Sequence, residues 1–259
     1  MSTEKNGWEL GIGERELSLL TKDMEDAHLD TLPAMQAGAT ELVGEIRTAD
    51  ADRRRFLAGA GIAAAAFALA GGVGAKAYAT ARGSSAAAAP SPYQGDLKVV
   101  ALAAALENQA VGAYGAALKA AAAGKLGKVP PAVGTFAKTA MEQHAAHAKA
   151  WNAVLTGAGK PAITGVPLSN QPATLKALGQ AKDVGAVARL ALSLEDQAAQ
   201  TYLFAAGHVA SPAGIRTAAS IAPVEAMHAA ILHFVLGEYP VPDAFLQTDR
   251  AAKPTLLTV

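Results

Sequence analysis

The chain has 259 residues, of which 51% are hydrophobic and 17% are charged, so it is long enough for one ordinary domain and an additional segment. Its 22 basic and 22 acidic residues balance, which leaves no overall charge that would favour nucleic acid as a partner. It has no cysteine, which excludes disulfide bonds, thiolate metal sites, a cysteine nucleophile and a cysteine-linked lipid anchor.

Residues 1–51 form a long N-terminal leader in which acidic residues outnumber basic ones. Their pattern predicts short amphipathic helices. His28 stands in this leader beside Glu25, Asp26 and Asp30, and we interpret this face as exposed to solvent. A binding site for a cytoplasmic chaperone is the alternative interpretation of the segment.

Residues 52–81 have the features of an export signal. The basic stretch RRRFL precedes an apolar run rich in alanine and glycine, and small residues follow that run. The stretch resembles the twin-arginine export motif, although Asp52 stands where that motif usually begins with serine or threonine. The residues that carry this resemblance are Arg53, Arg54, Phe56 and Leu57.

Ala77 and Ala79 form the expected cleavage site of this signal. Without cleavage, residues 56–75 would be just long enough to anchor the chain in a membrane, but alanine and glycine make them a poor span. We therefore expect an exported protein of the periplasm or cell envelope, with the twin-arginine export machinery as its partner. The resemblance implies export in the folded state, often with a cofactor already bound. Residues 82–95 are rich in serine, alanine and proline and predict a flexible linker.

From residue 96 onward the sequence predicts an all-α domain. Capping residues, prolines and glycines delimit its helices. The expected helices are 96–123, 131–157, 184–209 and 212–236, with a shorter one near 173–180. Only the second and third long helices are joined by a long link, so residues 96–237 predict a four-helix bundle with one long crossover. Residues 238–259 predict an extended tail that packs Phe245 on the bundle and ends in a loosely ordered segment.

Two stretches of this domain match each other. LENQAVGAY at 106–114 and LEDQAAQTY at 194–202 each place a glutamate seven residues before a tyrosine. The second helix of each half carries a shorter match, HAAHA at 144–148 and EAMHA at 225–229. Residues i and i+3 share one helix face, so both side chains of each pair project in the same direction. The domain is therefore predicted to be two copies of one helical hairpin, with polar side chains directed into the bundle.

Three buried carboxylates that meet at one depth would repel one another and stay protonated unless cations compensate them. A glutamate from each of two helices and a Glu-x-x-His pair from each of two others is the pattern of di-iron and di-manganese carboxylate sites, so the domain resembles the ferritin-like superfamily. Its likeness is greatest to exported bacterial ferritin-like domain proteins, which are related to desiccation-associated ones. The resemblance implies a centre of two divalent metal ions, iron or manganese, with zinc as an alternative. The implied ligands are Glu107, His144, His147, Glu195, Glu225 and His228.

The sequence departs from the superfamily pattern at His144, where that pattern has a glutamate. Glu142 cannot replace it, because a shift of two residues turns a side chain about 200° around the helix. Three glutamates and three histidines still suit iron, manganese or zinc, but a centre with one ion, two ions or none stays open. Tyr114 and Tyr202 follow their glutamates by two turns, and we expect buried hydroxyls that bond across the bundle beside the ligands.

Three functions are compatible with this interpretation. The first is redox chemistry at a metal centre, either ferrous-ion oxidation or the removal of peroxide. The second is a non-catalytic ferritin-like module with a stress-protective or interaction role, and the third is metal storage without turnover. A homo-oligomer is compatible with each of them, and nucleic acid is expected as a partner in none.

Overall fold

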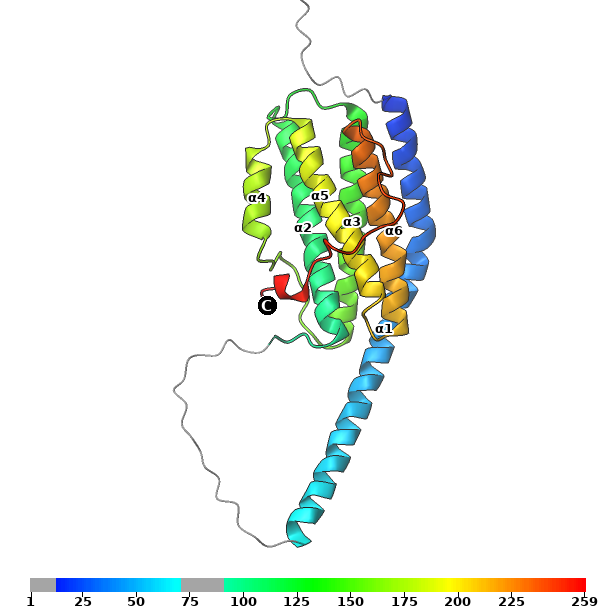
Figure 1. The fold of residues 1–259 in the computed structure, drawn as a ribbon, viewed down its shortest axis with the longest axis vertical. Coiled ribbons are helices and arrows are strands. Elements are labelled where there is room, and N and C mark those ends of the chain that lie inside the picture. Colours follow the sequence, from blue (N-terminus) through cyan, green and yellow to red (C-terminus); the bar gives the residue numbers. More distant parts are fainter. Residues whose placement is uncertain (1–12, 71–90) are drawn as a thin grey trace, which may run out of the picture.

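The computed structural model describes residues 13–70 and 91–259, and of residues 53–70 it describes only the helical backbone. Within these parts the chain forms long helices that run side by side along one axis (Figure 1). The predicted cleavage residues Ala77 and Ala79 lie outside the described residues. So do the side chains of the export motif, which are those of Arg53, Arg54, Phe56 and Leu57.

Four long helices form the predicted bundle. They are α2 (Asp96–Ala122), α3 (Pro131–Gly157), α5 (Val184–Ala206) and α6 (Pro212–Val235). Helices α2 and α3 pack together as one hairpin, and α5 and α6 pack as the other. The crossover between α3 and α5 contains the short helix α4 (Gln171–Gln180), which packs on the outside of α2 and α5 (Figure 1). The prediction of an all-α bundle with one long crossover between its second and third helices is confirmed.

Side chains at the helix starts fix how the two hairpins meet. Asp183 and Ser211 cap the first turns of α5 and α6 by accepting backbone N–H hydrogen bonds at 2.7 and 3.1 Å. Asp96 lies in the first turn of α2, and its carboxylate accepts hydrogen bonds from the backbone of Ala210 and Ser211 in the α5–α6 link. These bonds join the ends of the hairpins and set the register at which side chains from α2, α5 and α6 meet.

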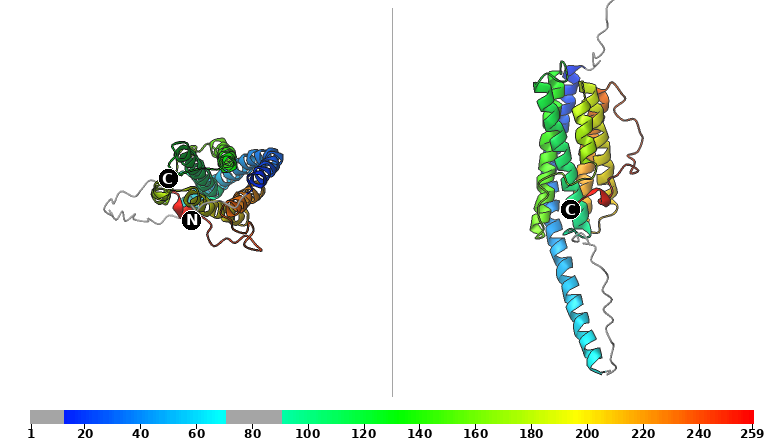
Figure 2. Two further views of the ribbon diagram at one scale, coloured as in Figure 1. Left: turned by 90° about the horizontal axis from the view of Figure 1, so that it is seen from above. Right: turned by 90° about the vertical axis from the view of Figure 1, so that its left-hand side faces the viewer.

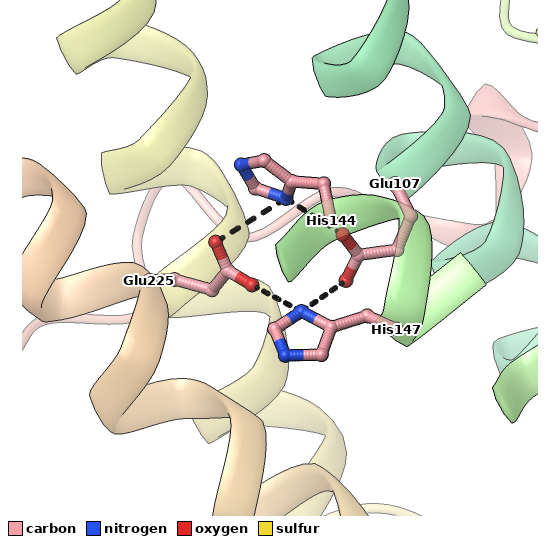
Figure 3. Close-up of side chains that lie close together, drawn as sticks. All are labelled: Glu107, His144, His147 and Glu225. Atoms are coloured by element: carbon pink, nitrogen blue, oxygen red, sulfur yellow. Dashed lines mark hydrogen bonds and ion pairs between the residues drawn. The ribbon is translucent and has the colours of Figure 1, made fainter. Parts of the chain in front are cut away.

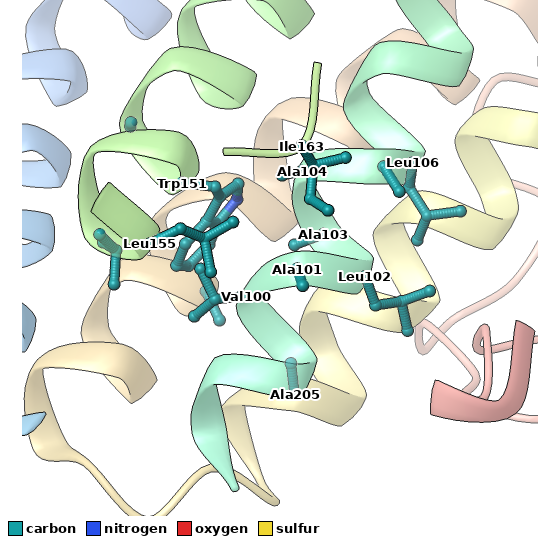
Figure 4. Packing of buried hydrophobic residues seen from close by; sticks show 14 of the residues in the cluster. Val100, Ala101, Leu102, Ala103, Ala104, Leu106, Trp151, Leu155, Ile163 and Ala205 are labelled. Carbon is teal, nitrogen blue, oxygen red and sulfur yellow. The ribbon is translucent and has the colours of Figure 1, made fainter. Parts of the chain in front are cut away.

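Two apolar clusters fill the interior of the bundle. The Trp151 cluster includes Val100, Leu102, Trp151, Leu155 and Ala205 (Figure 4). The Phe136 cluster includes Tyr114, Phe136, Ala140, Leu232 and Val235. Along each of the four helices, the residues of one cluster are followed by those of the other, and the predicted ligands stand between the two. The polar layer is therefore enclosed by apolar side chains on both sides, which keep bulk water away from it.

The N-terminal segment is one long helix, α1 (Glu14–Ala70), rather than the short solvated helices that the acidic leader predicts. Its first part packs along α3 and α6 as a fifth helix of the bundle, and its last turns extend past the end of the bundle (Figures 1 and 2). Its buried side chains recur at intervals of three, four or seven positions, which places them on one helix face. They are Leu17, Thr21, Met24, His28, Met35, Ala39 and Leu42.

A close approach and two polar contacts fasten α1 to its neighbours. A Cβ atom on Gly38 would lie 3.9 Å from the Cβ atom of Thr217 on α6, so the two helices are in direct contact there. Arg47 donates to the carbonyl oxygen of Gly157 at 2.8 Å, at the C-terminal end of α3, where the helix carries partial negative charge. Glu45 accepts a backbone hydrogen bond at 3.3 Å from the first turn of α6, where the partial charge is positive.

The C-terminal tail is attached to the crossover through its backbone. Leu257 forms a short antiparallel bridge with Leu168, directly after the 3₁₀ helix η1 (Pro254–Leu256). The end of the chain is therefore held in place by main-chain hydrogen bonds. Phe245 is 80% exposed, so the expectation that this ring packs on the bundle is wrong.

Among the residues that the structure describes, α6 is the one helix whose length and apolar character would suit a membrane span. Slightly more than half of its most apolar window, 56%, is buried inside the bundle, and we interpret α6 as a core helix. The anchor considered at residues 56–75 lies where no side chains are described.

Candidate metal centre

Four helices deliver the six predicted ligands to one buried layer. Glu107 comes from α2, His144 and His147 from α3, Glu195 from α5, and Glu225 and His228 from α6. None of the six is more than 2% exposed. Their ligand atoms form two overlapping groups, and within each group the four atoms lie within 4.8 Å of one another.

The first group consists of Glu107, His144, His147 and Glu225 (Figure 3). Nδ1 of His144 lies 2.7 Å from a carboxylate oxygen of Glu107 and 3.6 Å from one of Glu225. Nδ1 of His147 lies 3.0 Å from Glu225 and 3.6 Å from Glu107. Two carboxylates and two imidazoles therefore face a common point between α2, α3 and α6.

The second group consists of His144, Glu195, Glu225 and His228. Nε2 of His144 lies 3.1 Å from Glu195, and Nδ1 of His228 lies 3.3 Å from Glu195 and 3.2 Å from Glu225. His144 and Glu225 thus belong to both groups. His144, the residue that departs from the superfamily pattern, presents Nδ1 to Glu107 of the first group and Nε2 to Glu195 of the second.

Pairing between imidazoles and carboxylates sets the charge of this cluster in the absence of metal. Burial alone would raise the pKa of Glu107, but His147 and His144 outweigh it and lower this pKa to about 2. Burial would also lower the pKa of His147, but Glu107 and Glu225 raise it to about 9. The same competition between burial and nearby carboxylates raises the pKa of His144 and that of His228. Carboxylates therefore face protonated imidazoles when no ion is present.

The two tyrosines of the repeat hold the two glutamates of the repeat. The Tyr114 hydroxyl donates to Glu195 at 2.5 Å, and the Tyr202 hydroxyl donates to Glu107. Tyr202 in turn accepts a hydrogen bond from the indole N–H of Trp151 at 2.8 Å. Both tyrosines are buried, and their hydroxyls reach carboxylates across the bundle, on the helix of the opposite half.

The residues present fit a metal ion, because two ligand atoms lack a hydrogen-bonding partner. Nδ1 of His147 and Oε1 of Glu225 are buried and neither makes a hydrogen bond, although they lie 3.0 Å apart. The two atoms are held only by an ion pair that lacks hydrogen-bond geometry, and a metal ion bound by both would give each of them a direct partner. Carboxylate oxygens and imidazole nitrogens suit iron, manganese and zinc. The cluster is therefore consistent with a di-metal site.

Three residues beside this cluster were not predicted from the sequence. His28 on α1 is 4% exposed, and its ring centroid lies 5.2 Å from that of His147. Burial, together with the charges of the three cluster histidines, lowers the pKa of His28 to about 4 and outweighs the opposite effect of Glu107. Gln143 is buried, and its amide oxygen lies next to the His228 ring. The amide N–H of Gln143 donates a hydrogen bond to Glu25 on α1.

The sequence contained a signal for His28, since Glu25 and His28 repeat the Glu-x-x-His spacing of Glu225 and His228. Glu142, which helix geometry turns away from the ligands, is exposed, and its carboxylate lies 3.7 Å from Nζ of Lys138.

An apolar cavity of about 60 Å³ lies beside the cluster, toward the Phe136 end of the bundle. Its lining includes Tyr114, Phe136, Leu232 and Val235. The Phe136 ring also packs edge-on against His228, with ring centroids 6.3 Å apart. The cavity is large enough for one or more small molecules, and its apolar lining favours apolar ones.

The comparisons with known proteins agree with this geometry. The model of the ferritin-like domain matches residues 95–238, which is more than half of the chain. This range begins at the start of α2, ends after α6 and contains all six ligands, whereas α1 lies outside it. The chain has no significant match among curated proteins or among solved structures. With more than half of its length matched to that model, the chain belongs to the ferritin-like domain family.

Proposed function

We propose that this protein binds two divalent metal ions, iron or manganese, and uses them for redox chemistry, either the oxidation of ferrous ions or the removal of peroxide. The observation that carries the proposal is the sharing of His144 and Glu225 between two groups of ligand atoms. One ion needs only one such group, whereas two groups with common members can hold two ions close together. Glu225 suits the shared position because Oε1 lies next to His147 and Oε2 lies next to His228.

The residues of the chain hold, orient and isolate the centre. Tyr114 and Tyr202 fix the carboxylates of Glu195 and Glu107, so these ligands are oriented before an ion arrives. The apolar clusters on both sides exclude bulk water, and the cavity beside Tyr114 offers a place for a small oxidant. Bound iron or manganese would supply the change of oxidation state that the reaction needs.

A non-catalytic ferritin-like module with a stress-protective or interaction role is the second candidate. One observation favours it, because His144 replaces a carboxylate with an imidazole and three imidazoles then face three carboxylates. Protonated imidazoles would neutralise these carboxylates without any metal, and the cluster would be a buried ion-pair network. Metal storage without turnover shares the ligands of the first candidate and lacks its reaction.

Oxygen and peroxide consumption by the metal-loaded full chain separates these candidates. The redox proposal expects turnover that is lost in Glu225→Ala and retained in Glu142→Ala, which removes an exposed carboxylate from α3. If the loaded chain consumes neither oxidant faster than the free metal ion does, the redox proposal is wrong, and the non-catalytic module and metal storage remain.

We also propose that the chain is exported to the periplasm or cell envelope by the twin-arginine route. The support is the stretch RRRFL and the apolar run after it. The first part of α1 precedes this signal and packs on α3 and α6, so it would have to detach when the bundle crosses a membrane. Cell fractionation of the wild type and of the Arg53→Lys, Arg54→Lys double variant provides the test. Export of the wild type alone supports the route, and equal distribution of both proteins contradicts it.

A further inference from the structure

We propose that helix α1 is a wall of the metal centre, in which His28 is a further imidazole ligand on the His147 side and Glu25 positions His228. The inference rests on the metal centre proposed above and adds a fifth helix to it. The ferritin-like domain match begins at residue 95, so these two side chains lie outside the matched domain. Both come from one face of α1, three residues apart.

His28 is a buried polar side chain whose ring packs against a ligand of the cluster. The side chain is 4% exposed, and neither Nδ1 nor Nε2 has a hydrogen-bond partner. Its ring meets the ring of His147 at a centroid separation of 5.2 Å and an angle of 65°. Nδ1 of His147 makes no hydrogen bond and is paired with the carboxylates of Glu225 and Glu107 by charge, at 3.0 and 3.6 Å. His28 therefore places two ring nitrogens without a hydrogen-bond partner on a ring that packs against the ligand His147.

A packing role explains this arrangement less well. Neighbouring buried positions on the same face of α1 are occupied by Met24 and Met35, which fill space without polar atoms. A histidine with two unbonded nitrogens is a costly filler, because both atoms lose their hydrogen bonds to water on burial. An imidazole nitrogen that binds a metal ion does not carry this cost.

The hydrogen bonds of Gln143 determine which nitrogen of His228 is free to bind metal. The amide N–H of Gln143 donates to the carboxylate of Glu25, which can only accept hydrogen bonds while ionised. The amide oxygen of Gln143 must then face His228, and it lies 2.7 Å from Nε2 of that ring. Nε2 of His228 is therefore the donor, and Nδ1 is the nitrogen left for the metal.

Nδ1 of His228 is also the atom that faces Glu195 and Glu225, at 3.3 and 3.2 Å. Glu25 thus acts through Gln143 to fix the tautomer of a ligand, as hydrogen-bond partners behind metal-bound histidines do. A bundle without α1 would keep Gln143 but lose the carboxylate that orients its amide.

Titration of the full chain with Co²⁺, followed by visible absorption and by elemental analysis, tests the role of His28. The proposal expects His28→Leu to weaken Co²⁺ binding by tenfold or more and to change the absorption spectrum of the bound ion. It also expects the metal-free variant to unfold at the wild-type temperature or above it, because leucine removes the unbonded nitrogens. Asp30→Asn, an exposed change on the same helix, is the control and should match the wild type.

The same titration tests the role of Glu25. The Co²⁺ affinity of Glu25→Ala should be about 10–100-fold lower than that of the wild type, which is the usual loss when residues that hydrogen-bond to and orient metal ligands are removed. Glu25→Gln keeps an oxygen that can accept from Gln143 and should restore most of the affinity. In the zinc-loaded wild type, nitrogen NMR of the His228 ring should find the proton on Nε2.

The metal centre and the roles of His28 and Glu25 can be refuted separately. If the wild-type chain binds no Co²⁺, iron or manganese, the metal centre itself is refuted, and this inference with it. If the wild type binds metal and His28→Leu binds it with the same affinity and spectrum, His28 only fills space and the inference about α1 is wrong. Equal binding by Glu25→Ala and Glu25→Gln would contradict the positioning role of Glu25.

Discussion

The hydroxyl of Tyr114 on α2 lies 2.5 Å from Oε1 of Glu195 on α5, and Tyr202 on α5 makes the equivalent bond to Glu107 on α2. A tyrosine seven residues after a glutamate lies about 10 Å farther along its own helix and cannot hold that glutamate itself. Each half of the internal repeat therefore supports the carboxylate of the other half. This exchange explains why the same glutamate and tyrosine occur twice at one spacing.

Removal of either hydroxyl should destabilise the metal-free protein. Tyr202→Phe should lower the free energy of unfolding more than Tyr114→Phe does. Tyr202 also accepts the indole N–H of Trp151 at 2.8 Å, so phenylalanine there deprives two buried groups of a partner instead of one. Each such group costs about 1–3 kcal/mol. Urea unfolding of the two variants measures the difference, and equal or reversed losses would contradict the assigned bonds.

The metal-free protein should lose stability as the pH rises from neutral to alkaline values. The pKa of His147 is about 9 in the folded chain against an ordinary value of 6.5, so its contribution is complete below pH 6.5 and disappears as the pH passes 9. The shift corresponds to on the order of 3 kcal/mol. The pKa of Glu107 is about 2 in the folded chain against an ordinary value of 4.5. The stability that this carboxylate contributes is therefore lost as the pH falls from 4.5 toward 2.

Thermal unfolding of the chelator-treated protein between pH 4 and pH 10 tests this dependence. The expected optimum lies between about pH 4.5 and 6.5, as the two shifted pKa values require. His147→Gln is the matched variant, and its stability should depend less on pH above 6.5. A wild-type melting temperature that rises steadily toward pH 9 would show that these imidazoles are not protonated in the folded state.

Metal binding should release protons, because an ion can bind an imidazole nitrogen only after the proton on it leaves. The pKa of His147 is about 9, so that ring carries a proton at pH 7 when no metal is present. The affinity should therefore rise by about tenfold per pH unit for each proton displaced. Calorimetric titration in buffers of different ionisation enthalpy counts these protons, and binding heats that do not depend on the buffer would disprove the displacement.

The docking of α1 can be tested with a disulfide, because the chain has no cysteine of its own. A Cβ atom on Gly38 would lie 3.9 Å from Cβ of Thr217, within the range of about 3.5–4.5 Å found in disulfides. Gly38→Cys with Thr217→Cys should therefore cross-link on mild oxidation. Gly44→Cys with Thr217→Cys is the control, since nothing lies within 4 Å of a Cβ atom on Gly44. Absence of the first cross-link, or equal formation of both, would show that α1 does not occupy this position in solution.

The bundle could be predicted because its helix boundaries and its repeat are both local features of the sequence. Asp183 and Ser211 cap their helices, and the predicted helix 131–157 coincides with α3. The six candidate ligands converge because matched positions in two copies of a hairpin come to equal depth. The exact distances, and the division of His144 between two groups, depend on tertiary packing and could not be read from spacing.

The position of α1 could not be predicted from composition. Its acidic surface and the RRRFL stretch indicate a leader, and its buried face mixes Thr21 and His28 with apolar residues, which weakens the amphipathic pattern. The spacing of Glu25 and His28 was the available signal for a role beside the ligands. The attachment of the tail had no such signal, because the contact of Leu257 with Leu168 is made by the backbone.

Metal content per chain tests the central claim most directly. The full chain, purified without chelators and then loaded with iron or manganese, should contain two ions per chain by elemental analysis. Glu225→Ala should contain fewer, because Glu225 contributes to both groups of ligand atoms. One ion per chain in the wild type would contradict a dinuclear centre. No bound ion after loading would show that the histidines and glutamates of this layer form a structural ion-pair network.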